Sequence, residues 1–241
     1  ALAGETTPVE YRFRDAANQP FWIELHFKTV EIEGQLQLLA ILRDISERKQ
    51  VEARLQYHAL HDALTELPNR AMILGKLQEM LDSRYPRHEL SALLLLDINR
   101  FKVINDSLGH DIGDRMLAVI GQRLQSCLRV GDIVARLGGD EFLLLLAELR
   151  QPGDAMICAE RVHQSLSDSF YIGDHEIHAT ASIGIALNQG DRQRAEDMLR
   201  DADIALHQAK ARGKDQPYVL FDSAMYDQMV RLMQLERDLR R

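Results

Sequence analysis

Arg136-Leu137-Gly138-Gly139-Asp140-Glu141-Phe142 is the stretch of this sequence that decides the fold. Its two glycines bend the backbone tightly and leave room for a ligand to approach. Apolar residues continue on both sides, through 133–135 before the stretch and 143–146 after it, so the pattern predicts a β-hairpin. Carboxylates at such a turn are well placed to hold a divalent metal against a phosphate.

The composition is that of a globular protein with a sizeable core. The chain has 241 residues, of which 46% are hydrophobic and 27% are charged, which is enough for one or two domains. The formal net charge of −8 argues against a nucleic-acid binder or an anionic-membrane binder. We therefore expect this acidic chain to handle phosphates through metal ions and local basic pockets.

No apolar run is long enough to span a membrane and no signal peptide is visible, so we expect a cytoplasmic location. Cys127 and Cys158 lie in helical apolar patterns, and we expect reduced core thiols rather than a disulfide or a zinc site. The sequence does not begin with Met, which suggests a piece of a longer protein that could be anchored to a membrane elsewhere.

The first part of the chain is predicted to be all-β and then to change to helix. Alternating residues at 9–14, 21–27 and 36–42 indicate three antiparallel strands. Three such strands are marginal alone, so we expect them to belong to a larger sheet or to pack on a partner. Residues 46–60 have helical apolar spacing, and Ser46 can cap this connecting helix, which a second copy could pair with.

From residue 62 onward, helical and strand patterns alternate, which predicts an α/β (α+β) domain whose helices cover a central sheet. We expect helices ending at Leu81, around 117–128, over 154–168 and over 195–211. Strands are expected at 93–96, on both sides of the glycine pair, at 179–186 and at 218–221. Residues 223–241 are predicted to form a last helix.

Asp97 follows the continuous apolar run of residues 93–96, which indicates a buried strand. A carboxylate at a strand end beside a hairpin turn is a common magnesium ligand in phosphoryl transfer. Free backbone N–H groups in the turn after Ile98 could cradle phosphates, and Lys102 adds a positive charge. The alternative is a strand end with a solvated Asp and Lys.

Asn105 and Asp114 are a second polar pair. An Asp carboxylate can accept the N1–H and 2-amino hydrogens of guanine, and an Asn amide can supply the complementary hydrogen bonds. The alternative needs no ligand: Asn105 ends one helix and Asp114 caps the next. Spacing alone favours the alternative.

The sequence closely resembles the GGDEF family of diguanylate cyclases over about residues 60–221. The resemblance is carried by these blocks in order: Asp62-Ala63-Leu64-Thr65-Glu66-Leu67-Pro68-Asn69-Arg70, Asp97-Ile98-Asn99-Arg100-Phe101-Lys102-Val103-Ile104-Asn105-Asp106-Ser107-Leu108-Gly109-His110-Asp111-Ile112-Gly113-Asp114, Gly138-Gly139-Asp140-Glu141-Phe142, Ser182-Ile183-Gly184-Ile185-Ala186 and Ala202-Asp203-Ile204-Ala205-Leu206-His207-Gln208-Ala209-Lys210.

The resemblance implies a fold similar to the palm of nucleotidyl cyclases and polymerases. It implies an enzyme that joins two GTP into cyclic di-GMP and releases two pyrophosphates. Two Mg²⁺ (or Mn²⁺) ions per active site are implied, with the carbonyl of Ile98 and the side chains of Asp97, Asp140 and Glu141 as ligands and the last two as catalytic residues. By the same resemblance, Asn105 and Asp114 bind guanine, and the triphosphate is surrounded by Phe101, Lys102, Lys210 and Lys214.

By the same resemblance one domain holds one GTP, so the reaction would require two domains that face each other. The resemblance therefore implies a homodimer, formed through the connecting helix and the segment before it. Three positions depart from the usual family pattern: Lys214 stands for Arg, His207 for Tyr and Glu66 for Gly. Lys214 keeps the charge but loses the bidentate grip of Arg, which puts full activity in doubt but removes no metal ligand.

Arg129 and Asp132 lie a few residues before the glycine pair. An Arg fork can grip a guanine edge or a phosphate, and the Asp can steady it. The alternative is a surface ion pair of small energetic value. The resemblance implies an inhibitory site for the product, cyclic di-GMP, that Arg161 completes.

The flanks resemble parts of other signalling domains. We expect residues 1–45 to be the C-terminal part of a PAS sensor domain and 46–61 a signalling helix. The GGDEF domain is expected over 62–221, and 222–241 resembles a linker towards an EAL phosphodiesterase domain. The alternative function is a GTP-binding regulatory module that controls such a phosphodiesterase, and a purely structural dimerisation scaffold is a third interpretation.

Overall fold

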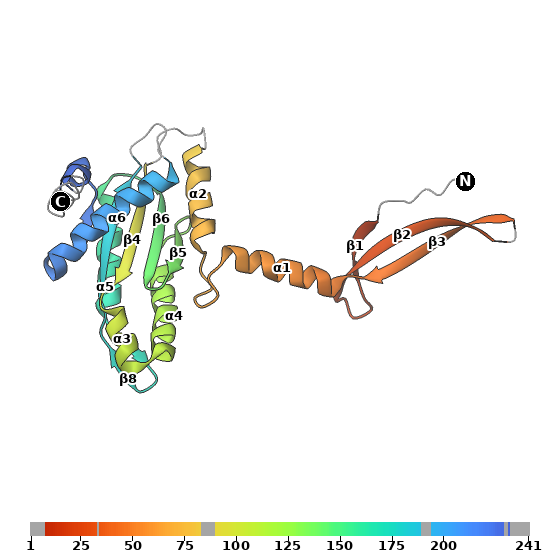
Figure 1. Ribbon diagram of the computed structural model, residues 1–241, viewed down its shortest axis with the longest axis horizontal. Helices are drawn as coiled ribbons and strands as arrows, with labels where there is room; N and C mark the ends of the chain where they lie inside the picture. The colour runs from red at the N-terminus through yellow and green to blue at the C-terminus, as the bar shows by residue number, and fades with distance from the viewer. Residues whose placement is uncertain (1–7, 33, 83–89, 189–193, 229–230, 232–241) are drawn as a thin grey trace, which may run out of the picture. The chain divides into compact units, whose positions relative to one another are not determined.

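The computed structural model describes residues 8–32, 34–82, 90–188, 194–228 and 231. The chain divides into two compact units, Ala1–Ala59 and Leu60–Arg241. Figure 1 shows the elements of each unit. Within the described residues, no helix has the length and apolar character needed to cross a membrane.

The first unit is a three-stranded sheet followed by a helix. Strands β1 (Val9–Arg14), β2 (Pro20–Ile32) and β3 (Gln35–Asp44) pair antiparallel in that order, as the alternation predicts. Helix α1 (Ser46–Leu60) follows. The hydroxyl of Ser46 accepts the N–H of Trp22 at 2.8 Å, which ties the start of the helix to β2.

The register of this sheet separates an apolar face from a polar one. Tyr11 lies opposite Ile23, and Leu25 lies opposite Leu42, so these side chains share one face. On the other face, Lys49 of α1 pairs with Glu10 at 2.6 Å. Residues of the apolar face stay open to solvent, with Leu42 61% exposed. This exposure fits the expectation that the three strands need something to pack against.

The second unit contains the remaining elements. In chain order they are α2 (Arg70–Asp82), β4 (Leu90–Ile98), α3 (Phe101–Leu108), α4 (His110–Ser126), β5 (Ile133–Gly138), β6 (Glu141–Leu149), α5 (Gly153–Ser167), β7 (Phe170–Ile172), β8 (His175–Ile177), β9 (Ala181–Leu187), α6 (Ala195–Arg212), a 3-10 turn (Gly213–Asp215) and β10 (Tyr218–Leu220).

The central sheet has five strands in the order β10-β9-β4-β6-β5. The β9–β10 pair is parallel and the other pairs are antiparallel, so the fold is a mixed α/β architecture with a mostly antiparallel sheet, as predicted. Helices lie on both faces of this sheet (Figure 1). Strand β4 lies in the middle, which explains why its residues 92–96 are continuously apolar.

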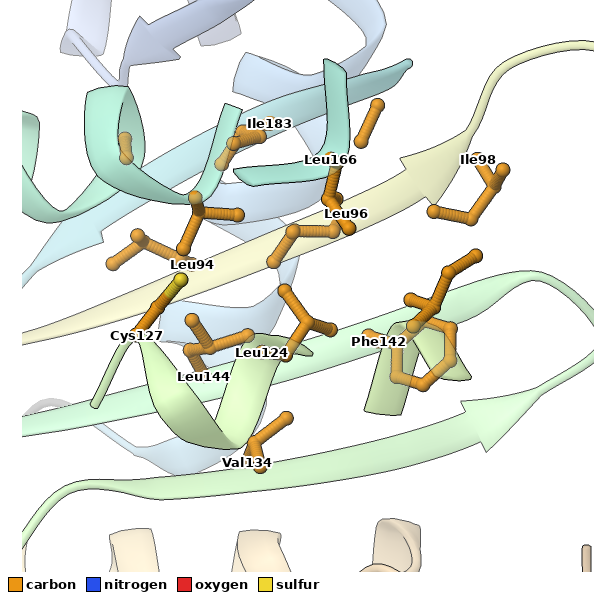
Figure 2. Packing of buried hydrophobic residues seen from close by; sticks show 14 of the residues in the cluster. Leu94, Leu96, Ile98, Leu124, Cys127, Val134, Phe142, Leu144, Leu166 and Ile183 are labelled. Atoms are coloured by element: carbon orange, nitrogen blue, oxygen red, sulfur yellow. The ribbon is translucent and has the colours of Figure 1, made fainter. Parts of the chain in front are cut away.

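The two faces of β4 pack into two different cores. Leu94 and Leu96 belong to the core that includes α4 and α5, and Figure 2 shows them beside Leu124 and Leu144. Leu93 and Leu95 point to the opposite face, into the core that includes α2 and α6. Because side chains alternate along a strand, a strand covered on both sides is apolar at successive positions, as at 92–96.

Several details differ from the sequence-based expectations. The β7–β8 hairpin was not anticipated, although Gly173 at its turn, with φ of 60°, is a usable signal. Asp114 lies inside α4, whose N-cap is Gly109, so the expectation that Asp114 could cap that helix is wrong. Cys127 and Cys158 are free and buried, as expected. Of the last helix, residues 223–228 are helical, and most of the remainder lies outside the described residues.

Gly184 of β9 is where α6 comes closest to the sheet. A Cβ at this position would lie 2.0 Å from the carbonyl oxygen of Ala202 and 2.3 Å from the backbone nitrogen of Leu206. Both atoms belong to helix backbone, which cannot move aside as a flexible side chain can. The contact therefore requires glycine for reasons of packing.

We predict that Gly184→Ala lowers the free energy of unfolding by about 1–3 kcal/mol, because α6 must move away from the sheet. Urea denaturation followed by circular dichroism measures this change. Gly75→Ala is the matched control, since a Cβ there meets nothing within 4 Å and should stabilise helix α2 by about 0.5–1 kcal/mol. Equal stability of Gly184→Ala and the parent chain would contradict the close-packing argument.

Candidate functional site

Three carboxylates meet where β4 ends beside the β5–β6 turn. The strand register places Asp97 of β4 opposite Glu141, the first residue of β6. Asp140 precedes Glu141 in the turn, and its carbonyl accepts the N–H of Ile98 at 3.2 Å. Gly138 and Gly139 have φ of 143° and 54°, a backbone that side chains other than glycine rarely adopt. The glycine pair thus folds the turn back onto the end of β4.

The close spacing of these carboxylates changes how readily they ionise. Burial raises the pKa of Asp140 above its ordinary value, and the charge of Asp97 raises it further. Burial also raises the pKa of Glu141, with further contributions from Asp97 and Asp140. The site therefore concentrates negative charge that a nearby cation would relieve.

Helix α6 brings one cation and one further acid to the same place. Lys210 lies 2.5 Å from the carboxylate of Asp97, whereas the sequence analysis placed Lys210 at the triphosphate. The charge of Asp203 also raises the pKa of Glu141, so Asp203 faces the site. The sequence analysis gave Asp203 no role, although its spacing of about two helical turns from Lys210 puts both residues on one side of α6.

The donor set suits a hard divalent cation. Asp97, Asp140, Glu141 and the carbonyl of Ile98 offer only oxygen, which Mg²⁺ and Mn²⁺ prefer. Among the residues that the structure describes, no group of three or more His, Cys, Asp or Glu side chains is close enough to enclose a metal alone. Mg²⁺ typically uses one or two carboxylates and takes its other ligands from water and phosphate, so the residues fit a cation shared with a nucleotide.

Arg136 holds the turn in place. Its guanidinium donates two hydrogen bonds to the carbonyl of Gly139, at 3.0 and 2.8 Å, and one to Asp62 at 2.9 Å. The side chain is only 10% exposed. Arg136 begins the stretch that opened the sequence analysis, yet it was given no role there, because nothing in the pattern says which carbonyl or carboxylate its fork will meet.

The partner of Arg136 belongs to the loop after α1. Asp62 accepts hydrogen bonds from the backbone and hydroxyl of Thr65. Burial alone raises the pKa of Asp62, but these bonds and Arg136 outweigh it, so the net pKa is lowered. Glu66 has φ of 58°, a left-handed conformation that explains physically why glycine is usual at this position.

A polar network supports the turn that follows β4. The side chain of Asn99 donates to the hydroxyl of Thr180 at 3.0 Å and accepts from Ser182 at 2.9 Å. The backbone N–H of Asn99 donates to the carbonyl of Thr180 at 2.8 Å. Arg100 then adopts a left-handed conformation, after which α3 begins. These contacts fix the direction in which α3 leaves the sheet.

The predicted nucleotide-binding residues differ in their surroundings. Phe101 is buried in the core, whereas Lys102 and Asp114 are exposed. Asn105 is half-buried, and its side-chain oxygen has no hydrogen-bond partner among the described residues. The side chain of Lys214 lies outside the described part of the chain. The structure thus places a polar acceptor, Asn105, in a position where a ligand could satisfy it.

Arg129 and Asp132 form more than a surface ion pair. The Asp132 side chain is only 4% exposed and accepts the N–H groups of Arg129 and Ala147. The Arg129 guanidinium donates to the carbonyls of Ala147 and Glu148, at the end of β6. This pair therefore ties the turn before β5 to the end of β6, and Arg129 remains 50% exposed.

Arg161 lies near the same turn. Its guanidinium contacts the sulfur of Cys158 at 3.8 Å. Burial raises the pKa of the Cys158 thiol; Arg161 lowers it and Asp132 raises it, so both charges lie close to this sulfur. The three residues Arg129, Asp132 and Arg161, which the sequence analysis grouped together, are brought into one neighbourhood.

Comparisons with known proteins found similar sequences and structures. A family model described as "Diguanylate cyclase, GGDEF domain" matches residues 59–216. Over 182 residues the chain is 40% identical to the bifunctional diguanylate cyclase/cyclic di-GMP phosphodiesterase MucR of Pseudomonas aeruginosa, which covers 76% of this chain and 26% of MucR. Over 196 residues it is 35% identical to the cyclic di-GMP phosphodiesterase NbdA of the same species, covering 81% of this chain and 25% of NbdA.

A solved structure that comprises only the GGDEF domain of TpbB from Pseudomonas aeruginosa has a TM-score of 0.66 and 38% sequence identity to this chain. The match covers 72% of this chain and 99% of that structure. The chain spans about a quarter of the length of the curated relatives MucR and NbdA.

We predict that Glu141→Gln stabilises the protein against heat at neutral pH in the presence of a metal chelator. A carboxyl whose pKa is raised by folding binds its proton more tightly in the folded state, so ionisation costs stability as the pH rises through the raised pKa. The difference in stability between Glu141→Gln and the parent chain should therefore shrink as the pH falls towards the ordinary glutamate pKa of about 4.3. Thermal melts across this range measure the difference.

Adding Mg²⁺ should stabilise the parent chain more than Glu141→Gln, because the cation loses a ligand in the variant. Glu148→Gln, at an exposed position on the same strand, controls for the loss of a surface carboxylate. A Glu141→Gln variant that is less stable than the parent chain at neutral pH without metal would contradict the charge crowding inferred for this site.

Proposed function

This chain belongs to the GGDEF family of diguanylate cyclases, and we propose that it condenses two GTP molecules into cyclic di-GMP with release of two pyrophosphates. The observation that carries the proposal is the cluster of Asp97, Asp140 and Glu141 at the end of β4, with Lys210 against Asp97. The family model is described as a diguanylate cyclase and the relative TpbB is named one, and divalent cations commonly assist phosphoryl transfer. The cluster retains the oxygen ligands that such chemistry needs.

In the proposed reaction, the ribose 3′-hydroxyl of one GTP attacks the α-phosphorus of the other, and the bond to the β-phosphate breaks. The 3′-hydroxyl of the second nucleotide then attacks the α-phosphorus of the first, which releases the second pyrophosphate and closes the ring. A carboxylate of the turn, Asp140 or Glu141, accepts the proton of the hydroxyl, and a raised pKa makes either one a better base. A divalent cation held by Asp97, the Ile98 carbonyl, Asp140 and Glu141 would lower the pKa of the hydroxyl and neutralise the leaving pyrophosphate.

The remaining predicted residues bind and orient the nucleotide. We assign guanine recognition to Asn105 and Asp114, and contacts to the triphosphate to Lys102, Lys210 and Lys214, with Phe101 supporting the turn from the core. The Lys210 ammonium has three N–H donors, so it can contact Asp97 and a phosphate together. Asp203 adds negative charge beside Glu141 and so helps to hold the cation.

We further propose that two copies face each other, because each domain holds only one of the two reacting nucleotides. Helix α1 and the three-stranded sheet before it are the proposed dimerising and sensing part. The open apolar face of that sheet supports an association of this kind. Whatever aligns the two catalytic domains can then regulate the rate.

The proposed activity is tested by incubating the chain with GTP and Mg²⁺ and measuring cyclic di-GMP and pyrophosphate by chromatography. Sedimentation of the same sample reports whether it is dimeric. We expect product from the parent chain, and a fall in rate of about 100-fold or more for Asp140→Asn, since a metal ligand and candidate base is lost. Glu148→Gln, on the exposed end of β6, should keep the parent rate.

The outcome also separates the two candidate functions. A dimeric sample that binds GTP but yields no cyclic di-GMP would refute the cyclase and favour a GTP-binding regulatory module. The similarity to MucR and NbdA, whose names include phosphodiesterase activity, gives that alternative its weight. The intact Gly138-Gly139-Asp140-Glu141-Phe142 sequence favours the cyclase.

We also propose that cyclic di-GMP inhibits the enzyme by binding at Arg129, Asp132 and Arg161. Arg129 is half-exposed and Asp132 is buried behind it, so the guanidinium is oriented while its outer edge is free to meet a guanine or a phosphate. Arg161 approaches the same turn from α5. These contacts support a preformed anion-binding surface away from the carboxylate cluster.

Arg129→Ala should raise the cyclic di-GMP concentration needed for half-inhibition by about tenfold or more, the effect of losing a charge-assisted pair of hydrogen bonds. Initial rates with added product measure this change, and thermal melts report the loss of the carbonyl contacts. Arg150→Ala, an exposed arginine just after β6, is the control. Unchanged inhibition of Arg129→Ala would show that the product site has been assigned incorrectly.

A further inference from the structure

Gly113 of α4 lies against the tip of the Asn105 side chain. A Cβ built on Gly113 would lie 1.8 Å from the Asn105 Oδ1 and 3.0 Å from its Cγ, and 3.2 Å from the Cζ of Phe101. Asn105 and Phe101 are one turn apart on α3, so both rest on the same bare patch of α4 backbone. The place that Asn105 occupies exists only because residue 113 has no side chain.

The position of Asn105 is unusual for a polar side chain. Its Oδ1 is buried and finds no hydrogen-bond partner within the described residues. Buried polar atoms are nearly always satisfied, and an exception calls for an explanation. A ligand that donates a hydrogen bond at this position would satisfy the oxygen.

Backbone contacts fix the corner between α3 and α4. The N–H of Gly109 donates to the carbonyl of Asn105 at 2.9 Å, and the N–H of Gly113 donates to the carbonyl of Gly109 at 3.3 Å. Gly109 is the single residue between the end of α3 and the start of α4, so the corner is tight. Asp114 is exposed and follows Gly113 directly in α4. Asn105 and Asp114 therefore both lie near the corner between α3 and α4.

We propose that Gly113 is a specificity-determining positioning residue, which gives Asn105 the space it needs to recognise guanine. This inference rests on the proposed function, in which Asn105 and Asp114 bind the base. Gly113 itself touches no nucleotide in this account. It acts through Asn105, because a methyl group at residue 113 and the observed Asn105 amide cannot occupy the same space.

The structure indicates what would yield in Gly113→Ala. The atom within 2 Å of the added methyl group is the end of a flexible side chain, whereas the ring of Phe101 needs to shift only slightly. The Asn105 amide would turn away and the helices would stay in place. The variant should therefore keep its fold and lose guanine recognition, as Asn105→Ala should.

A double-mutant cycle tests this coupling. The full chain, Gly113→Ala, Asn105→Ala and the double variant are titrated with GTP and with ATP, in the presence of Mg²⁺, by calorimetry. We expect the parent chain to prefer GTP, and each single variant to lose affinity for GTP by about tenfold or more, which corresponds to about 1.4 kcal/mol. The double variant should bind GTP no more weakly than Asn105→Ala. Binding of ATP should change little, because the phosphate contacts remain.

Gly75→Ala is the control for a Gly-to-Ala change inside a helix, since its Cβ meets nothing within 4 Å, and it should bind GTP as the parent chain does. A Gly113→Ala variant that binds GTP like the parent chain would overturn the inference, as would a double variant whose losses simply add. A parent chain that does not prefer GTP to ATP, or an Asn105→Ala variant that keeps the preference, would instead refute guanine recognition by Asn105, and this inference with it.

The stability of the same four proteins guards against a folding artefact. If Gly113→Ala is less stable than the parent chain, removing the Asn105 amide should relieve the clash with the added methyl group. The double variant should then melt at a higher temperature than Gly113→Ala. Failure of Asn105→Ala to rescue an unstable Gly113→Ala would show that residue 113 serves helix packing alone, and would overturn the proposal.

Discussion

The antiparallel pairing of β4 with β6 is the interaction on which the rest of the structure depends. It sets Asp97 directly opposite Glu141, and the same register sends alternate leucines of β4 into separate cores on the two faces of the sheet. A slip of one residue would exchange the faces and separate the carboxylates. The stability of the domain and the geometry of the acidic cluster are therefore set by one register.

Arg136 connects the β5–β6 turn to the loop that follows α1. Its guanidinium joins the carbonyl of Gly139, in the β5–β6 turn, to the carboxylate of Asp62, in the loop after α1. Because the side chain is almost fully buried, the ion pair is less screened by solvent than a surface pair. The position of the turn thus depends on the conformation of the loop at Asp62.

Like charges held together give the site its chemical character. Burial and mutual repulsion raise the pKa values of Asp140 and Glu141, while Lys210 offsets the charge of Asp97. Such an arrangement is unfavourable for folding and favourable for binding a cation. The amide oxygen of Asn105, beside Gly113, has no hydrogen-bond partner among the described residues, which is a second local cost. Both fall on residues for which we propose nucleotide chemistry, and functional sites are where such local costs are expected.

The sequence by itself determined the strand run of β4, the hairpin at Gly138-Gly139 and the identity of the acidic residues, because apolar periodicity and glycine pairs are local signals. It also grouped Arg129, Asp132 and Arg161 through a family resemblance. Only the tertiary structure decided that Arg136 meets Asp62, that Asp203 and Lys210 face the carboxylates, and that Asn105 rests on Gly113. These contacts join residues from different elements, and their partners depend on how helices pack on the sheet, which no local pattern encodes.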